Sequence, residues 1–208
     1  MNPRILPLLL AAASLLFAGC FPESVNPLST PATSLIDQRL EGVYLAVDKS
    51  EAAKKERSYW HFHYRGTSDG AHGVRRSTTF LEILSVGHEP ERGLDLDRYE
   101  ALTTKIAGRD YLSFIRLPID GTKKQPVLYG FARYEFGWRG DLRIWLADEV
   151  AFAAAIKAGR IRGQVFGTHT VTGVKLTDTT AHLAAFIAAG DPEKLFGGKP
   201  MVFHRLAP

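Results

Sequence analysis

The chain has 208 residues, of which 45% are hydrophobic and 23% charged, a composition typical of a globular protein and not of a disordered one. Its formal net charge of +4 arises without a block of lysines or arginines, so the sequence does not indicate nucleic-acid binding. Cys20 is the only cysteine, which excludes a disulfide within the chain.

Residues 1–19 have the organisation of an export signal. Arg4 supplies a positive charge close to the start, and an apolar run follows from Ile5 to Phe17. This run is shorter than the roughly 20 residues that a helix needs to cross a bilayer. It fits the hydrophobic region of a cleavable signal peptide better than a permanent membrane span.

The signal ends in Phe17-Ala18-Gly19-Cys20, and these residues resemble the lipobox of bacterial lipoproteins, in which Phe17 would stand at a position that usually holds Leu. The resemblance implies cleavage before Cys20, a diacylglyceryl group on its thiol, and a further acyl group such as palmitate on the new amine. Two or more acyl chains give stable membrane attachment. In such lipoproteins an Asp directly after the cysteine resembles a signal for retention in the inner membrane. This chain has Phe21 there, so we expect the protein to be anchored in the outer membrane and to face the periplasm. The alternative is an ordinary secretory signal cut near Gly19.

Residues 20–35 are predicted to form the lipidated cysteine and a flexible tether. The segment is rich in Pro, Ser and Thr and has no apolar periodicity. If extended, it could hold a domain up to about 50 Å from the membrane. We expect a single domain over residues 36–208.

Alternating apolar and polar residues with turn signals between them predict an antiparallel meander over the first two thirds of this domain. Two strands are also expected near the end of the chain. The predicted strands are Leu40–Val47, Ser58–Arg65, Thr78–Val86, Tyr99–Ile106, Asp110–Leu117, Val127–Phe136, Asp141–Leu146, Gln164–Leu176 and Met201–Leu206.

Two helices are expected late in the chain, which makes the predicted fold class α+β. The first begins after Asp148 and runs to about Ala158, because an Asp at that position can accept hydrogen bonds from the free N–H groups of a helix start. The second begins after Asp178 or Thr179 and ends at Gly190. We expect both to pack on the sheet through Phe152, Ile156, Leu183, Phe186 and Ile187.

The first predicted strand contains Leu40-Glu41-Gly42-Val43-Tyr44, which resembles the Gly-x-Trp element of lipocalin-like barrels with Tyr44 in place of Trp. Arg205, on the last predicted strand, stands where that family often has a basic residue packed on the aromatic ring. The resemblance implies that the sheet is a partly closed lipocalin-like barrel, as an alternative to an open meander. Closure would pair the first and last strands and bring Tyr44 and Arg205 together.

Two histidines form the first candidate for a metal site. His61 and His63 are two residues apart on a predicted strand, so their side chains point the same way and could bind zinc or copper. Trp60, Phe62 and Tyr64 alternate with them and supply the core face, which leaves the histidines on the solvent-facing side. A third ligand does not follow nearby in the sequence, and we predict no metal.

Other candidates for chemistry have the wrong spacing. The acidic segment 89–97 is interleaved with arginines and lacks the pattern of a calcium loop. Gly197-Gly198-Lys199 is followed by Pro200 where a phosphate loop has Ser or Thr, and His169 is expected on a strand surface. The sequence contains neither a Gly-x-Ser-x-Gly elbow nor a His-Glu-x-x-His helix. We therefore predict no catalytic residue and no cofactor.

The sequence favours a membrane-anchored lipoprotein with a non-enzymatic structural or interaction role in the cell envelope, whose partner would be an envelope protein. Two alternatives stay open: a lipocalin-like binder of a small apolar ligand, and a hydrolase whose catalytic residues are scattered along the chain. Inward-facing residues around a cavity would favour the binder, and a filled core would favour the structural role. Histidines and carboxylates converging in a cleft would favour the hydrolase.

Overall fold

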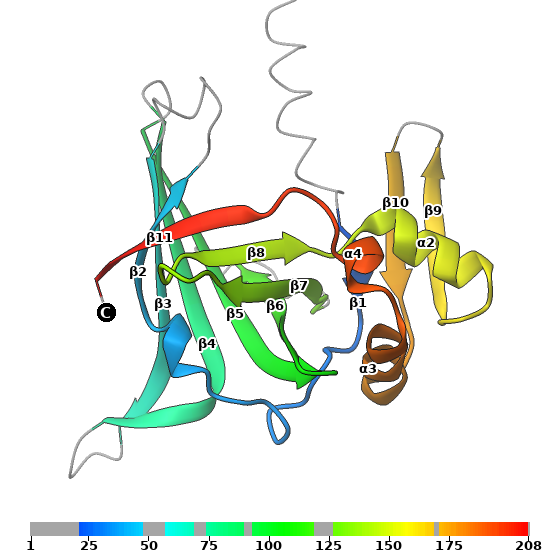
Figure 1. Ribbon diagram of the computed structural model, residues 1–208, viewed down its shortest axis with the longest axis horizontal. Coiled ribbons are helices and arrows are strands. Elements are labelled where there is room, and N and C mark those ends of the chain that lie inside the picture. Colours follow the sequence, from blue (N-terminus) through cyan, green and yellow to red (C-terminus); the bar gives the residue numbers. More distant parts are fainter. Residues whose placement is uncertain are drawn as a thin grey trace, which may run out of the picture.

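The computed structural model describes residues 21–47, 57–68, 74–89, 93–118, 127–168 and 171–207 (Figure 1). The predicted signal peptide, Cys20, Glu91 and His169 lie outside these described residues. Among the helices within them, none is long and apolar enough to cross a membrane.

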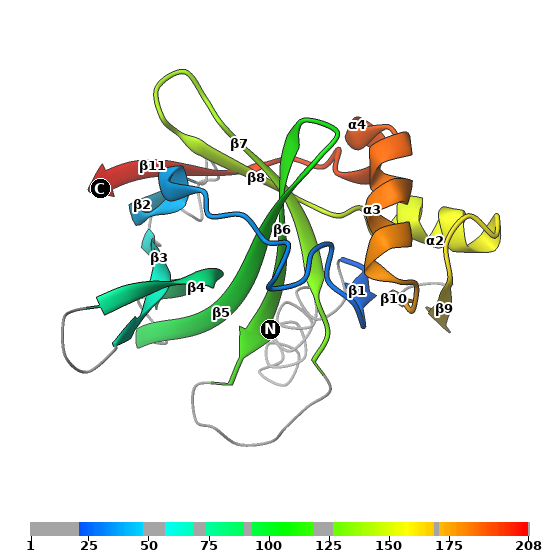
Figure 2. The same ribbon diagram turned by 90° about the horizontal axis from the view of Figure 1, so that it is seen from below.

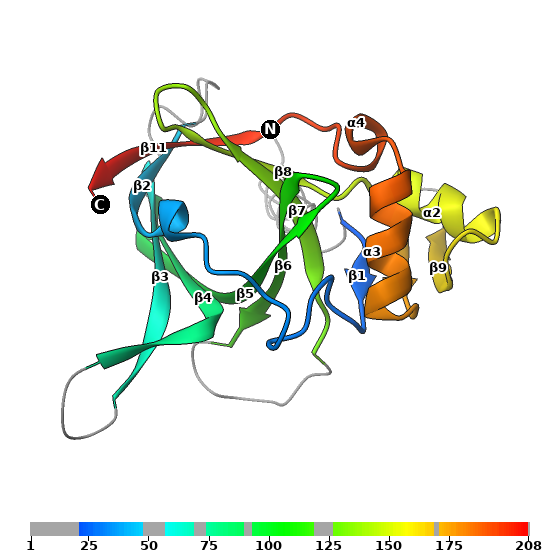
Figure 3. The ribbon, with the colours of Figure 1, turned by 60° about the horizontal axis from the view of Figure 1, so that its bottom comes forward.

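Eight antiparallel strands form a closed barrel in the order β11-β2-β3-β4-β5-β6-β7-β8, seen along its axis in Figure 3. Each strand from β2 to β7 pairs with the next along the chain, and β11 closes the barrel by pairing with both β2 and β8. The prediction of an α+β fold with a lipocalin-like barrel is confirmed. The strands are β2 (Gly42–Val47), β3 (Arg57–Ser68), β4 (Val74–Glu89), β5 (Gly93–Ile106), β6 (Arg109–Leu117), β7 (Gly130–Phe136), β8 (Leu142–Leu146) and β11 (Met201–Ala207).

The predicted alternation of apolar and polar residues places one apolar face inside the barrel. Phe62 and Tyr64 are buried there, whereas His61, which precedes Phe62, is exposed on the outer face. The chain enters β2 through Gly42, whose φ of 144° favours glycine. The barrel core comprises Leu40, Tyr44, Phe62, Tyr64, Leu81, Ile83, Ala101, Leu112, Ala132, Tyr134, Leu142, Ile144 and Phe203.

A second layer covers the outer face of β6, β7 and β8 (Figure 2). It contains α2 (Glu149–Lys157), α3 (Thr180–Ala189), α4 (Pro192–Leu195) and a three-stranded sheet of β1 (Glu23–Ser24), β10 (Val171–Leu176) and β9 (Gly163–Thr168). One strand was expected over Gln164–Leu176, but the segment is a hairpin in which β9 and β10 pair antiparallel. The alternation continues through residues 164–176 without a strong turn signal, which explains the error.

Both predicted helices begin and pack as expected. The Asp148 side chain accepts a hydrogen bond from the Ala151 N–H at 2.8 Å, and the Thr179 side chain accepts one from the His182 N–H at 3.3 Å. All five predicted apolar side chains belong to the second core: Phe152, Leu183 and Ile187 are buried, and Ile156 and Phe186 are partly buried against it.

Residues 21–35 differ from the expectation of a flexible tether, because they are packed on the domain. Ser24 pairs with Tyr129 through two backbone hydrogen bonds, of 2.9 and 2.8 Å. Leu28 is 3% exposed, and its N–H donates to the Ser113 hydroxyl at 2.8 Å. Prolines remove only their own N–H groups, so the remaining donors can bond to the barrel and the few apolar side chains can be buried.

Candidate functional site: the two ends of the barrel

One end of the barrel is closed by residues 35–41, and we call it the plugged end. The short 3-10 helix η1 (Gln38–Leu40) and the segment before it lie across this end (Figure 3). Leu40 enters the barrel core and is fully buried, and the Leu35 N–H donates to the Thr103 carbonyl at 2.9 Å. The plug is therefore fixed by both apolar burial and backbone pairing.

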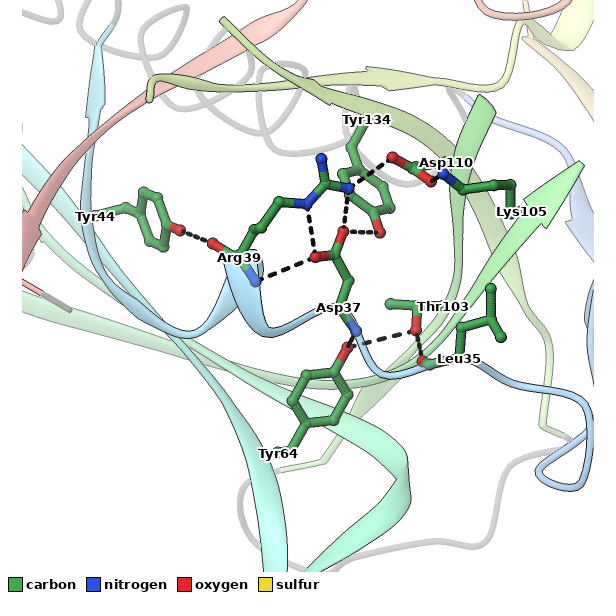
Figure 4. A network of polar contacts seen from close by, with 9 residues as sticks. All are labelled: Leu35, Asp37, Arg39, Tyr44, Tyr64, Thr103, Lys105, Asp110 and Tyr134. Atoms are coloured by element: carbon green, nitrogen blue, oxygen red, sulfur yellow. Dashed lines mark hydrogen bonds and ion pairs between the residues drawn. The ribbon is translucent and has the colours of Figure 1, made fainter. Parts of the chain in front are cut away.

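Asp37 is the centre of a polar network that holds the plug (Figure 4). Its carboxylate accepts hydrogen bonds from the Tyr134 hydroxyl at 2.9 Å and from the Arg39 guanidinium at 2.8 and 2.6 Å. Its own N–H donates to the Tyr64 hydroxyl at 2.7 Å. Burial alone would raise the pKa of Asp37, but the hydrogen bonds from Arg39 and Tyr134 outweigh it and hold that pKa below its usual value.

The charged groups of this network are paired with one another. The Asp110 carboxylate lies 2.8 Å from the Arg39 guanidinium and 3.2 Å from the Lys105 ammonium group. A cavity of about 210 Å³ adjoins them. Because Asp37, Arg39, Asp110 and Lys105 satisfy one another, the network is suited to locking the plug in place and not to acid–base chemistry.

The opposite end, which we call the aromatic end, is where β3 and β5 begin and β6 ends. The side chains of Trp60, Tyr99 and Phe114 lie on the inward face here and are only partly buried. The rings of Trp60 and Tyr99 are stacked, with centroids 6.0 Å apart and an interplanar angle of 11°. The indole N–H of Trp60 donates to the Ser58 hydroxyl at 2.8 Å, and this hydrogen bond fixes the ring. This end thus presents a pre-arranged aromatic surface.

A cavity of about 350 Å³ lies at the same end, between β8, β11 and the start of α2. Ile144 and Met201, opposite one another in the β8–β11 pair, and Leu146 supply apolar lining. Phe203, two residues after Met201 on the same face, makes an edge contact with Trp60 at 5.3 Å between centroids. The volume falls in the lower part of the range of about 300–1,000 Å³ that is typical of small-molecule sites.

Two acidic side chains also line this cavity. Asp148 is engaged in capping α2. Burial, and to a lesser extent the neighbouring Asp148 charge, raise the pKa of Glu149 above its usual value. Lys199 lines the cavity as well, so an apolar wall is combined with an edge that carries charges of both signs.

This sequence matches no protein-family model, no curated protein and no solved structure.

Tyr44 and Arg205, the residues proposed to close the barrel, lie opposite one another in the β2–β11 pair. The Arg205 guanidinium carbon is 5.9 Å from the centre of the Tyr44 ring, and the guanidinium also donates to the Glu41 carbonyl. The Tyr44 hydroxyl donates to the Arg39 carbonyl at 3.0 Å. The pair therefore connects the barrel seam to the plug.

The structure places the other candidate residues on the outside of the barrel or in ordinary pairs. The rings of His61 and His63 are stacked 4.8 Å apart, and His63 Nε2 lies 3.4 Å from the Glu82 carboxylate. A group of three or more metal-binding side chains does not occur in the part of the chain that the structure describes. Asp97, from the acidic segment, pairs with the Arg116 guanidinium.

Sequence reasoning did not identify the aromatic end or the plug. The alternation of Trp60 with the histidines correctly predicts that its side chain points inward. Tyr99 and Phe114 carry the same period-two signal, but that signal does not say at which height in a barrel a residue lies. Asp37 and Tyr134 are separated by 97 positions in the chain, and their contact has no local signature.

Proposed function

We propose that this protein is a non-enzymatic, exported and membrane-anchored lipoprotein whose barrel binds a small apolar molecule at the aromatic end. One observation supports the binding role most directly. The barrel interior is filled and plugged at one end. The other end has the partly exposed rings of Trp60, Tyr99 and Phe114 and a cavity of about 350 Å³. Evenly filled ends would have favoured a purely structural role.

The chemistry of the aromatic end favours a flat or chain-like apolar ligand. Stacked rings offer a large rigid surface, and contacts with such rings contribute about 0.5–1.5 kcal/mol per aromatic pair beyond the burial of area. The hydroxyls of Ser58 and Ser85 are 3.3 Å apart, and Ser58 also accepts from Trp60. Their hydrogen bonds are therefore made within the protein. Asp97, in register with Ser85, accepts from the Tyr99 hydroxyl and pairs with Arg116, so these groups are also satisfied and recognition would depend mainly on shape and apolar contact.

The resemblance of Phe17–Cys20 to a lipobox supports the anchor, through acyl chains on Cys20. Phe21 after the cysteine supports placement at the outer membrane, facing the periplasm. A binder fixed there would hold an apolar molecule that is poorly soluble in the surrounding water.

The binding role can be tested with the mature chain carrying Cys20→Ser, which removes the acylation site but keeps Phe21. The uncharged apolar fluorophore N-phenyl-1-naphthylamine is titrated and then displaced with palmitic acid. We expect saturable fluorescence enhancement, and Trp60→Leu should weaken binding about tenfold, because loss of an aromatic contact of this kind is worth about 1.4 kcal/mol.

Trp138→Leu is the matched control, since this tryptophan is 86% exposed in the turn between β7 and β8 at the plugged end. It should bind the fluorophore as the unsubstituted chain does. Near-ultraviolet circular dichroism shows whether each variant keeps its packed core. Equal affinities for all three folded chains, or no saturable binding by any of them, would refute the proposal.

A further inference from the structure

Four apolar side chains form a row across the outer face of the barrel near the aromatic end. Leu45 pairs with Tyr59, Tyr59 with Val86, and Val86 with Leu96, so all four belong to one row of outward-facing side chains across β2, β3, β4 and β5. Leu94 is one pleat nearer the aromatic end on the same outer face of β5 and is 76% exposed. We call these five residues the apolar collar.

On the side of this row away from the aromatic end the outer face becomes polar, and on the other side Leu94 shares its row with Arg57 and His88. The next row contains two charged or titratable side chains, His61 and Arg98, among its four residues. The row after that contains His63, Glu82 and Glu100, with Glu82 paired to Arg98. Single exposed apolar residues are ordinary on a protein surface, but a contiguous row of them indicates a surface that is covered by something.

Phe21, which directly follows the predicted lipid attachment point in the sequence, packs at this same end. The Phe21 ring lies 5.6 Å from that of Phe114, and both rings occupy the space left by Gly130, the first residue of β7. A Cβ atom on Gly130 would approach the Phe114 ring to 2.6 Å and the Phe21 ring to 2.8 Å. Cys20 directly precedes Phe21, and consecutive Cα atoms are only about 3.8 Å apart. Acyl chains on Cys20 would therefore begin beside the aromatic end.

We infer that the aromatic end faces the bilayer that holds the Cys20 acyl chains, with the apolar collar contacting the lipid. The inference rests on the anchoring part of the proposed function. The collar includes Tyr59, and tyrosine is enriched at membrane–water interfaces. Val150 and Met201, which line the cavity at this end, are 77% and 38% exposed and extend the apolar surface. An apolar ligand would then pass from the bilayer to the aromatic end without crossing water.

The full acylated chain, reconstituted in vesicles of phosphatidylethanolamine and phosphatidylglycerol, tests this orientation. Cys20 is the only cysteine and its thiol is consumed by acylation, so an introduced cysteine is the only free thiol. Leu94→Cys labels the collar and Trp138→Cys labels the plugged end, at positions of similar exposure, 76% and 86%. Leu96→Cys gives a second collar position. Each free thiol carries a nitroxide, whose accessibility to oxygen and to a water-soluble nickel chelate is measured.

We expect both collar labels to be accessible to oxygen and protected from nickel, and the label at residue 138 to show the reverse. If the chain floats with the vesicles but the nickel chelate reaches the collar labels, the proposed orientation is wrong and the anchor still stands. Collar labels protected from both reagents would overturn it in favour of a protein partner or a second copy. A chain that does not float with the vesicles would refute the anchor itself, and the orientation with it.

Discussion

The Arg205 guanidinium lies over the Tyr44 ring, with 5.9 Å between the guanidinium carbon and the ring centre, across the strand pair that closes the barrel. Tyr44 is fully buried, and its hydroxyl donates to the Arg39 carbonyl beside the plug. The contact therefore links the last strand of the barrel, the first strand and the plug.

Arg205 and Tyr44 should be energetically coupled. Cation–π contacts at exposed sites are worth about 0.5–1 kcal/mol, and Arg205 is exposed, so we expect a coupling near the lower figure. A double-mutant cycle with Tyr44→Leu and Arg205→Met, measured by urea unfolding, gives this energy. A coupling that cannot be distinguished from zero would mean that the two side chains are neighbours without mutual stabilisation.

Truncating Phe152 to Ala should lower the free energy of unfolding by about 3–5 kcal/mol, because the side chain is fully buried between α2 and the outer face of the barrel. Phe186→Ala should cost less, since that ring is only partly buried. Val150→Ala on the same helix is the control: Val150 is 77% exposed and its truncation should change stability by less than about 0.5 kcal/mol. A similar cost for all three would show that the second layer is not packed as described.

Asp178 should make stability depend on pH in the acid range. Its carboxylate is fully buried and accepts hydrogen bonds from the Arg162 and Thr179 N–H groups, each at 2.9 Å, and lies 2.6 Å from the His182 ring. Burial alone would raise the pKa of Asp178, but these hydrogen bonds outweigh it and hold the pKa well below its usual value. The resulting stabilisation is complete above the unfolded pKa of about 3.9 and is lost as the pH falls toward the folded pKa.

Asp178→Asn should therefore destabilise the protein at pH 7 by about 2 kcal/mol or more, and the difference from the unsubstituted chain should shrink below about pH 4. Urea unfolding from pH 7 to pH 3 measures both effects. Glu135→Gln is the control, because Glu135 is half-exposed and its ion pair with Arg143 spans 3.6 Å. A constant difference between the Asp178 variant and the parent across this range would contradict the argument.

Radiolabelled palmitate should be incorporated into the full chain in a bacterial host with lipoprotein processing, and Cys20→Ala should abolish both the labelling and the membrane association. The expectation follows from the lipobox resemblance and from the absence of any other thiol in the sequence. Cell fractionation and autoradiography measure the two outcomes. Equal labelling of both chains would place the acyl group elsewhere or show that labelling is unspecific.

The strands and helices could be predicted because their signals are local. Alternation placed Phe62 inside the barrel and His61 outside, and Asp148 marked the start of a helix that the structure contains. Burial of the segment 21–35 could not be predicted, because its contacts with Ser113 and Tyr129 come from strands about 85 or more positions away. Pro and Ser in that segment favour an extended chain, and an extended chain can be free or packed. Which of the two occurs depends on the surface beside it.

The seam between β11 and β2 sets the order in which this barrel can fold. The hydrogen bond from Arg205 to Glu41 joins residues 164 positions apart. Such a distant pairing forms slowly, because the entropy of closing the loop is lost before its contacts are gained. Until β11 arrives, the edges of β2 and β8 stay unpaired, and unpaired edges can bind other chains. The unfinished barrel is therefore the form most exposed to aggregation and to proteases, and we expect substitutions that slow the pairing of β11 to lower the yield of the protein more than its final stability.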